Sequence, residues 1–220
     1  MEATVEPQTL AVAPDGRGHW TVRLRNPGAT AATCRATVGG EAAAWAWVSP
    51  DEVRLEPGAD GALRVSLRLP PPPRPPAGRI AVPIEVRAGE AGTVVLEATL
   101  EVLPVVDLAA SVTPAGQLTV RNRGNIPTRA ALAVEGPASL DTTWVEVGPG
   151  EAATVRVDVS GKPGEIYTVR AEPDAGPAAS ATGTVPGVRA AGRRGRGRAL
   201  VTVPLLAAVA LVAGLVVARG

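Results

Sequence analysis

The chain has 220 residues, of which 22 are basic and 21 acidic, so its formal net charge is only +1. A balance this close to neutral excludes an overall field strong enough to draw the protein to nucleic acid. The single cysteine and single histidine exclude an intramolecular disulfide and a structural zinc site.

The N-terminal part of the chain follows a strand pattern. Residues 4–12 alternate loosely and predict a first edge strand, in which Pro7 is tolerated. Residues 19–26 alternate cleanly between apolar and polar, which predicts a strand with one buried face. The same reasoning predicts further strands at residues 33–38, 63–69, 80–87 and 93–103, with a short apolar run at residues 45–48 and apolar residues at 53 and 55 before a turn. Because turn signals separate these short runs, they favour a β-sandwich.

A proline-rich run at residues 70–76 interrupts the predicted strands. Polyproline II conformation is expected there, and two interpretations follow. The run is either a stiff link between the two sheets of the first sandwich or a ligand for an SH3-like partner.

Residues 105–186 repeat the features of the first half in the same order. Residues 119–125 resemble 21–26, residues 145–150 resemble 53–58, and residues 155–159 resemble 63–67. Two more strands are predicted at residues 166–171 and 181–185. The sequence therefore predicts two tandem Ig-like domains, at residues 1–104 and 105–186.

Residues 199–218 form an uncharged run long enough to cross a bilayer of about 30 Å as a helix. The alternative is a buried helix of a soluble domain, but the run is apolar on every face. The fold class predicted for the whole chain is all-β, with two tandem Ig-like β-sandwiches followed by one C-terminal transmembrane α-helix. Residues 187–198 would be a basic tether beside the membrane.

The arginines beside the predicted span favour a cytoplasmic location for the sandwiches. Five arginines precede the span and only Arg219 follows it; the five are Arg189, Arg193, Arg194, Arg196 and Arg198. Arginine excess marks the cytoplasmic side, and these residues would also contact anionic lipid. The first ten residues lack the pattern of a secretory signal, so a tail-anchored, single-pass membrane protein is expected. The alternative is an exported domain.

The segments "VSPDEVRLEPG", "PPPPRPPAG", "VRNRGNIP" and "VGPGEAATVRV" carry a resemblance. With them the chain resembles bacterial membrane proteins, common in high-GC actinobacteria, that have two Ig-like domains and one C-terminal span. These proteins are often labelled "hydrolytic protein", and their domains are similar to the Ig-like accessory domains of alpha-galactosidases. The resemblance implies an architecture and no catalysis, because function does not travel with a fold.

No pattern in the sequence indicates catalysis. No serine lies in a G-x-S-x-G elbow, His19 has no local triad signal, and acids such as Asp51 and Glu52 fall in turns. We therefore predict a protein that is not an enzyme, with no cofactor and no metal. The expected function is a scaffold that presents its domains to a protein partner, without nucleic acid.

The four tryptophans leave a second function open. Trp45 and Trp47 would share a face if their run is a strand, and Trp144 lies in the counterpart region of the repeat. Since phenylalanine is absent and bulk is scarce, all four are predicted to pack the cores, Trp20 most clearly. Exposed tryptophans would instead favour an exported accessory domain that binds polysaccharide near the cell wall.

Overall fold

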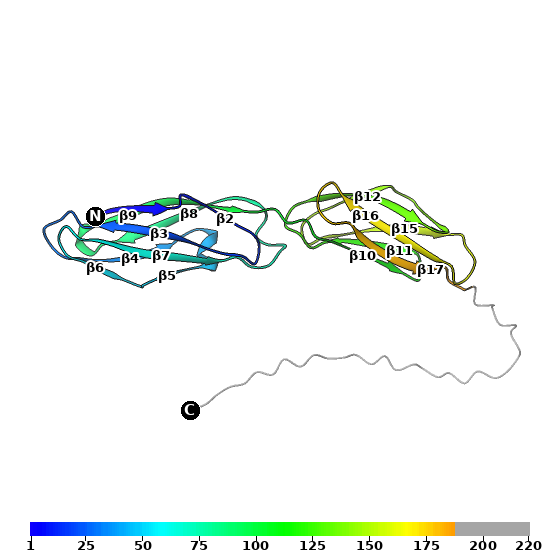
Figure 1. The fold of residues 1–220 in the computed structure, drawn as a ribbon, viewed down its shortest axis with the longest axis horizontal. Coiled ribbons are helices and arrows are strands. Elements are labelled where there is room, and N and C mark those ends of the chain that lie inside the picture. The colour runs from blue at the N-terminus through cyan, green and yellow to red at the C-terminus, as the bar shows by residue number, and fades with distance from the viewer. Residues whose placement is uncertain (188–220) are drawn as a thin grey trace, which may run out of the picture. The chain divides into compact units, whose positions relative to one another are not determined.

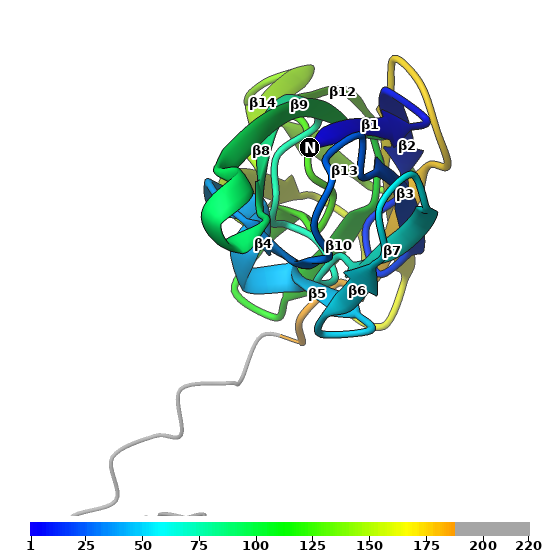
Figure 2. The same cartoon turned by 90° about the vertical axis from the view of Figure 1, so that its left-hand side faces the viewer.

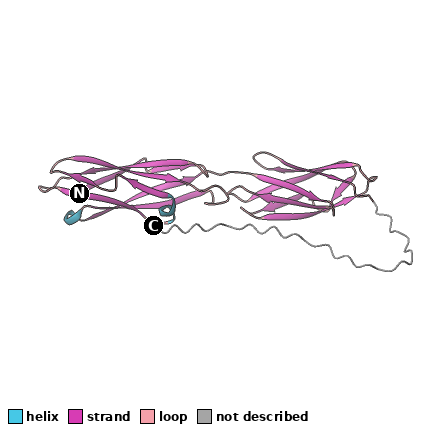
Figure 3. Cartoon of the chain, turned by 90° about the horizontal axis from the view of Figure 1, so that it is seen from below, coloured by secondary structure: helices cyan, strands magenta, loops and turns pink. Residues whose placement is uncertain are grey.

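The computed structural model describes residues 1–187, and their regular structure is almost entirely β. The two exceptions are short 3-10 turns, Glu41–Trp45 (η1) and Gly89–Ala91 (η2), drawn in cyan in Figure 3. The all-β prediction is confirmed for this part of the chain. None of its helices is long and apolar enough to cross a membrane. The predicted span and the five arginines before it lie outside the described residues.

The first sandwich consists of two sheets, with strand orders β1-β3-β7-β5 and β2-β9-β8-β4-β6. Figure 1 shows these strands in blue to green, and Figure 2, viewed from the N-terminal end, shows β8 and β4 on one side and β3 and β7 on the other. Its strands are β1 (Glu2–Glu6), β2 (Thr9–Val12), β3 (Arg17–Arg25), β4 (Ala32–Val38), β5 (Ala46–Ser49), β6 (Val53–Leu55), β7 (Asp60–Arg68), β8 (Gly78–Arg87) and β9 (Thr93–Val102).

The second sandwich also consists of two sheets, with orders β10-β11-β15-β13 and β14-β12-β16-β17. Its strands are β10 (Leu108–Thr113), β11 (Gln117–Asn122), β12 (Thr128–Glu135), β13 (Ala138–Leu140), β14 (Trp144–Val147), β15 (Ala152–Val159), β16 (Ile166–Pro173) and β17 (Ala179–Thr184).

The two sandwiches share one topology. In each, two sheets form a sandwich of the Ig-like kind, and β3, β4, β7, β8 and β9 correspond to β11, β12, β15, β16 and β17. In the first sandwich the short strand beside β7, which is β5, comes before the short strand beside β4, which is β6. In the second, β13 beside β15 likewise comes before β14 beside β12. This shared departure from the usual strand sequence agrees with an internal repeat.

Each sandwich encloses its own apolar core, which alternate residues of its strands supply. In β3, Trp20, Val22 and Leu24 are buried while the residues between them face outward, as the period of two predicts. The first core is built mainly from valine and leucine around Trp20. The second is centred on valines and on Tyr167. Burial of these side chains is the main force that holds each sandwich together.

Three local predictions were wrong. Residues 4–12 form two strands, since the chain passes from one sheet to the other at Pro7, where a proline cannot donate to a ladder. Residues 70–76 do connect strands of different sheets, β7 and β8, but they form a turn and a bend instead of an extended polyproline helix. The strand β12 was not expected, because alanines occupy both of its faces and mask the alternation.

A buried asparagine braces one corner of the second sandwich. The side chain of Asn122, at the end of β11, is inaccessible to solvent. Its Nδ2 donates to the carbonyl oxygens of Ile126 at 2.8 Å and Val147 at 2.9 Å, and its Oδ1 accepts from the backbone N–H of Gly124 at 2.9 Å. One amide therefore joins the loop that follows β11 to the end of β14, which meets the requirement that buried polar groups be paired.

Asn26 forms the same set of hydrogen bonds in the first sandwich, and we call this set the asparagine bracket. Its Nδ2 donates to the carbonyl oxygens of Thr30 at 2.8 Å and Leu55 at 3.1 Å, and its Oδ1 accepts from the N–H of Gly28 at 3.1 Å. These two asparagines belong to the repeated segments in the sequence. The repeat therefore preserves a hydrogen-bonding device as well as a hydrophobic pattern.

Replacing Gly183 with alanine is expected to destabilise the second sandwich by about 1–3 kcal/mol, the usual cost of overpacking a core. An added Cβ would lie 2.5 Å from the hydroxyl of Tyr167 and 2.7 Å from a methyl of Val112. Tyr167 is 98% buried and has little room to move. Chemical denaturation of the variant measures the loss, and Ser180→Ala on the exposed face of β17 is the matched control. Equal stability of the two variants would contradict the close packing.

Candidate functional site

The tryptophans divide into buried and exposed residues. Trp20 is fully buried, as predicted, and Trp45 packs partly against the first core. The prediction that all four fill the cores is wrong for Trp47 and Trp144, which are 52% and 48% exposed. The reason is register, since the neighbours of Trp47 in β5 and of Trp144 in β14 point inward.

The condition under which Trp45 and Trp47 would share a face, that their run is a strand, is not met. Trp45 ends the turn η1 and only Trp47 lies in β5, so the two do not share a strand face. Trp144 lies in β14, which pairs with β12, whereas β5 pairs with β7. The guanidinium of Arg129 stacks on the Trp144 ring at 4.5 Å from its centroid. One face of Trp144 is therefore already in contact with a cation.

Strand β5 presents a free edge. It pairs with β7 on one side only, and it is the last strand of its sheet. Among residues 1–187, no hydrogen bond to a backbone group of β5 is formed outside that ladder. Its four residues, Ala46–Ser49, carry no charge. An unpaired, uncharged edge is the feature that natural sheets usually avoid, because it can pair with another chain.

A hollow of about 370 Å³ adjoins this edge. Trp45 and Trp47 line it together with the start of the proline run and the ion pair of Arg68 with Asp15, in which Nη2 and Oδ1 are 3.5 Å apart. The full lining is Asp15, Ala44, Trp45, Ala46, Trp47, Arg68, Leu69, Pro70 and Pro71. Its size suits one or two amino-acid side chains.

The outer face around Trp47 is basic. Across the sheet, Trp47 lies opposite Ser66 of β7, and Ser66 lies opposite His19 of β3. Exposed arginines occupy the adjoining positions on both sides of this row. We call this set the Trp47 surface; its members are Arg17, His19, Trp47, Arg64 and Arg68. The sequence analysis did not identify these arginines as site residues. The signal that could have found them is their alternation with the buried residues of β3 and β7, which places them on one exposed face.

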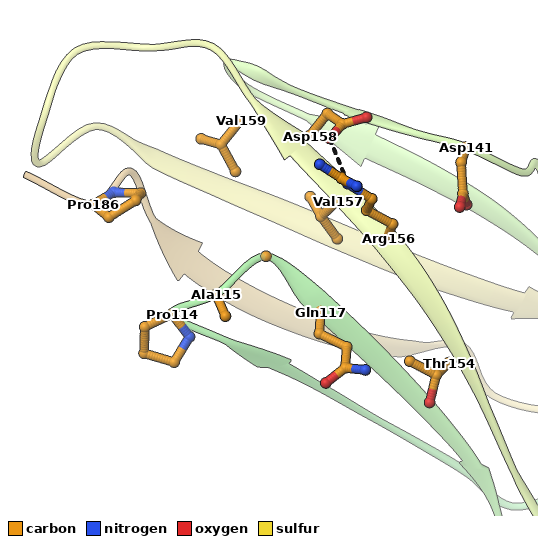
Figure 4. A pocket seen from close by; sticks show the side chains of 11 residues that line it. Pro114, Ala115, Gln117, Asp141, Thr154, Arg156, Val157, Asp158, Val159 and Pro186 are labelled. Atoms are coloured by element: carbon orange, nitrogen blue, oxygen red, sulfur yellow. Dashed lines mark hydrogen bonds and ion pairs between the residues drawn. The ribbon is translucent and has the colours of Figure 1, made fainter. Parts of the chain in front are cut away.

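A larger pocket, of about 780 Å³, lies in the second sandwich at the turn between β10 and β11 (Figure 4). Its charged residues include Arg156 and Asp158, which face each other with Nε and Oδ1 2.9 Å apart. Both side chains are mostly exposed, and such a pair contributes little free energy. The pocket thus offers one ion pair and one further acid, Asp141, with no aromatic side chain in its lining.

The geometry shows no assembled catalytic group within residues 1–187. Ser66 lies opposite His19 in the ladder, but no hydrogen bond joins the two side chains and no carboxylate orients the imidazole within that range. The described residues hold no cluster of three or more His, Cys, Asp or Glu that would bind a metal. Burial raises the pKa of the Cys34 thiol, which disfavours the nucleophilic thiolate.

No protein-family model matches the sequence, and no curated protein matches it either. Among solved structures, the chain is similar to a Porphyromonas gingivalis protein of unknown function, with 16% identity over 81% of this chain and 98% of that one, at a TM-score of 0.37. It is similar to the E. coli chaperone DraB (15% identity, 83% and 97% covered, TM-score 0.35). It is also similar to the Pseudomonas aeruginosa CupB2 chaperone (14%, 81% and 98%, 0.34). Similarities this distant carry no argument about function, which is argued below from the surface itself.

Proposed function

We propose that this protein is a non-catalytic, membrane-anchored interaction protein that binds an extended segment of a partner protein along β5. The observation that carries the proposal is the free, uncharged edge of β5 next to the exposed Trp47. Addition of a strand to such an edge supplies main-chain hydrogen bonds, while neighbouring pockets select the side chains. The hollow beside Trp47 and Trp45 is a pocket of this kind.

Several other sheet edges are less suited to strand addition. Strand β1 carries Glu2 and Glu6, and charged residues discourage pairing. In β6 and β14, the last carbonyl oxygen already accepts a hydrogen bond from a bracket asparagine. Strand β17 lies close to β10. Strand β5 combines an open backbone, an exposed aromatic side chain and a hollow.

The membrane part of the proposal rests on the sequence. The apolar run at residues 199–218 would anchor the protein, and the five arginines before it would hold the sandwiches on the cytoplasmic side. The resemblance to actinobacterial tandem Ig-like membrane proteins supports the same architecture. A tag at Met1 tests the side: it should resist protease on intact cells and be lost after lysis.

A second candidate function is polysaccharide binding by an exported form. The observation that favours it is the exposure of Trp47 and Trp144, since flat exposed indoles can stack on sugar rings. Loss of the Met1 tag from intact cells would place the sandwiches outside and favour this alternative over the cytoplasmic scaffold.

The interaction itself is tested by photo-cross-linking in cells. A photoreactive amino acid at Ser49, on the exposed side of β5, should give a cross-linked partner band, and one at Arg54 in β6 should not. Replacing Trp47 with alanine should reduce the Ser49 product about tenfold, since exposed aromatic anchors often carry more than 1 kcal/mol of binding. The matched control is Trp144→Ala, which should leave the product unchanged. Equal products at positions 49 and 54 would overturn the proposal.

A further inference from the structure

The charge of the Trp47 surface goes beyond what strand addition alone requires. Ladder register places Arg17 opposite Arg68, and Arg64 opposite both Thr21 and Ser49. Because residues two apart along a strand share a face and lie about 7 Å apart, the row that contains Trp47 and His19 has an arginine-bearing row on either side. The basic side chains are exposed, so they are available to a ligand.

Most of this positive charge is not neutralised by other residues in the range 1–187. Arg68 pairs with Asp15 at a long 3.5 Å, and both side chains are more than half exposed. Arg17, Arg64 and His19 form no ion pair with any residue in the range 1–187. By contrast, Arg23 and Arg25, further along β3, pair with Glu6 and Asp60. The arginines without a close ion pair therefore gather on the side of the sheet that includes Trp47.

We infer that the Trp47 surface selects an acidic extended segment, in which carboxylates alternate with apolar side chains. The inference rests on the proposed strand addition at β5. A strand added there would continue the sheet, so its outward side chains would lie next to Trp47 and Ser49. From those positions, glutamate side chains reach toward Arg64 and Arg68, while the alternate apolar residues extend the inner face beside Val48.

Two observations favour a protein ligand of this chemistry over other occupants. The free backbone of β5 offers N–H and C=O groups at the spacing of a strand ladder, which another extended peptide backbone matches and a polysaccharide or nucleic acid does not. A second copy of this chain pairing through its own β5 would bring no carboxylate to the arginines, since Ala46–Ser49 are uncharged. Charge complementarity therefore indicates an acidic partner segment.

The inference is tested on the full chain in detergent micelles by fluorescence anisotropy. The probes are a fluorescein-labelled nonapeptide in which glutamate alternates with valine, and its counterpart with lysine in place of glutamate. The glutamate peptide should bind more tightly, and the double variant Arg17→Glu/Arg64→Glu should weaken its binding about tenfold at low salt. The difference should shrink as salt is added, because exposed charges are screened. The control variant Arg79→Glu/Arg121→Glu reverses two exposed arginines elsewhere and should bind as the parent does.

The outcomes separate this inference from the proposed function. If the Ser49 cross-link forms but is unaffected by the Arg17→Glu/Arg64→Glu change, strand addition stands and charge selection is overturned. Equal binding of the glutamate and lysine peptides has the same meaning. If a single-stranded oligonucleotide or a sulfated polysaccharide binds as tightly as the glutamate peptide, the surface is a general polyanion site and the inference fails. A dimer that depends on β5, detected by analytical ultracentrifugation, would also overturn it. If the photoreactive amino acid at position 49 gives no cross-link in the otherwise unchanged protein, the proposed function itself is rejected.

Discussion

Replacing Asn122 with alanine is expected to destabilise the second sandwich by about 3 kcal/mol. The substitution leaves the carbonyl oxygens of Ile126 and Val147 and the N–H of Gly124 without their side-chain partner. Each buried polar group that loses its partner costs about 1–3 kcal/mol, and the groups nearest the loop recover part of this from solvent. The loss should appear as faster hydrogen exchange at the core amides of β11 and β15.

Two comparisons make this expectation specific. In Asn122→Asp the Oδ1 acceptor for Gly124 remains while both donated bonds are lost, so this variant should also unfold more easily. Core amides of the first sandwich should be unaffected in either case, because Asn26 supplies its own bracket there. Hydrogen exchange resolves the two sandwiches separately, which a single unfolding curve of a two-domain chain does not. Parent-like exchange in Asn122→Ala would show that the bracket is dispensable.

Replacing Trp20 with alanine is expected to cost the first sandwich about 4 kcal/mol, the usual range for a buried tryptophan. Its side chain is fully buried and is the largest in the first core, in a protein without phenylalanine. Val65 lies opposite Trp20 on the paired strand, and a valine cannot fill the cavity that the indole leaves. Denaturant titration followed by exchange at the amides of β3 and β7 measures the loss.

Phenylalanine at position 20 should be much better tolerated, at a cost of about 1 kcal/mol. The indole Nε1 of Trp20 is buried and has no hydrogen-bond partner among the described residues. Removing that N–H removes an unsatisfied donor, which offsets part of the lost packing. A cost for Trp20→Phe as large as that for Trp20→Ala would show that the N–H is satisfied after all.

The strand pattern of this fold was predictable where one face of a strand is buried and the other is solvated. Residues 19–26 and 63–69 alternate so cleanly that their buried side chains could be named from the sequence. In β12 the signal failed because Ala131 and Ala133 face outward while Ala130 is buried, so the two faces differ little in polarity. The repeat was visible because Asn26 and Asn122 occur within similar segments.

The interaction surface was far less predictable, because it depends on which strands become neighbours. Trp47 was expected in the core on the ground of bulk, but β5 is an edge strand whose Val48 already faces inward. Arg17 and Arg64 are 47 positions apart in the sequence and share a surface only because β3 pairs with β7 in one register. A shift of that register by one residue would turn one of the two arginines toward the core while the other stayed outside. Alternation in the sequence indicates on which face of a sheet a residue lies, but only the pairing of the strands determines which residues lie beside it.

The asparagine bracket has a consequence for how the two copies have diverged. By position in the ladders, Ser139 of β13 occupies the place of Trp47, and Asp158 occupies the place of Ser66. The corners that carry Asn26 and Asn122 are nevertheless the same in both copies. When these hydrogen bonds stabilise the fold of a duplicated domain, the sequence of its edge strand, β5 or β13, can change without loss of the fold. One sandwich can then acquire a binding surface while the other keeps only a structural role.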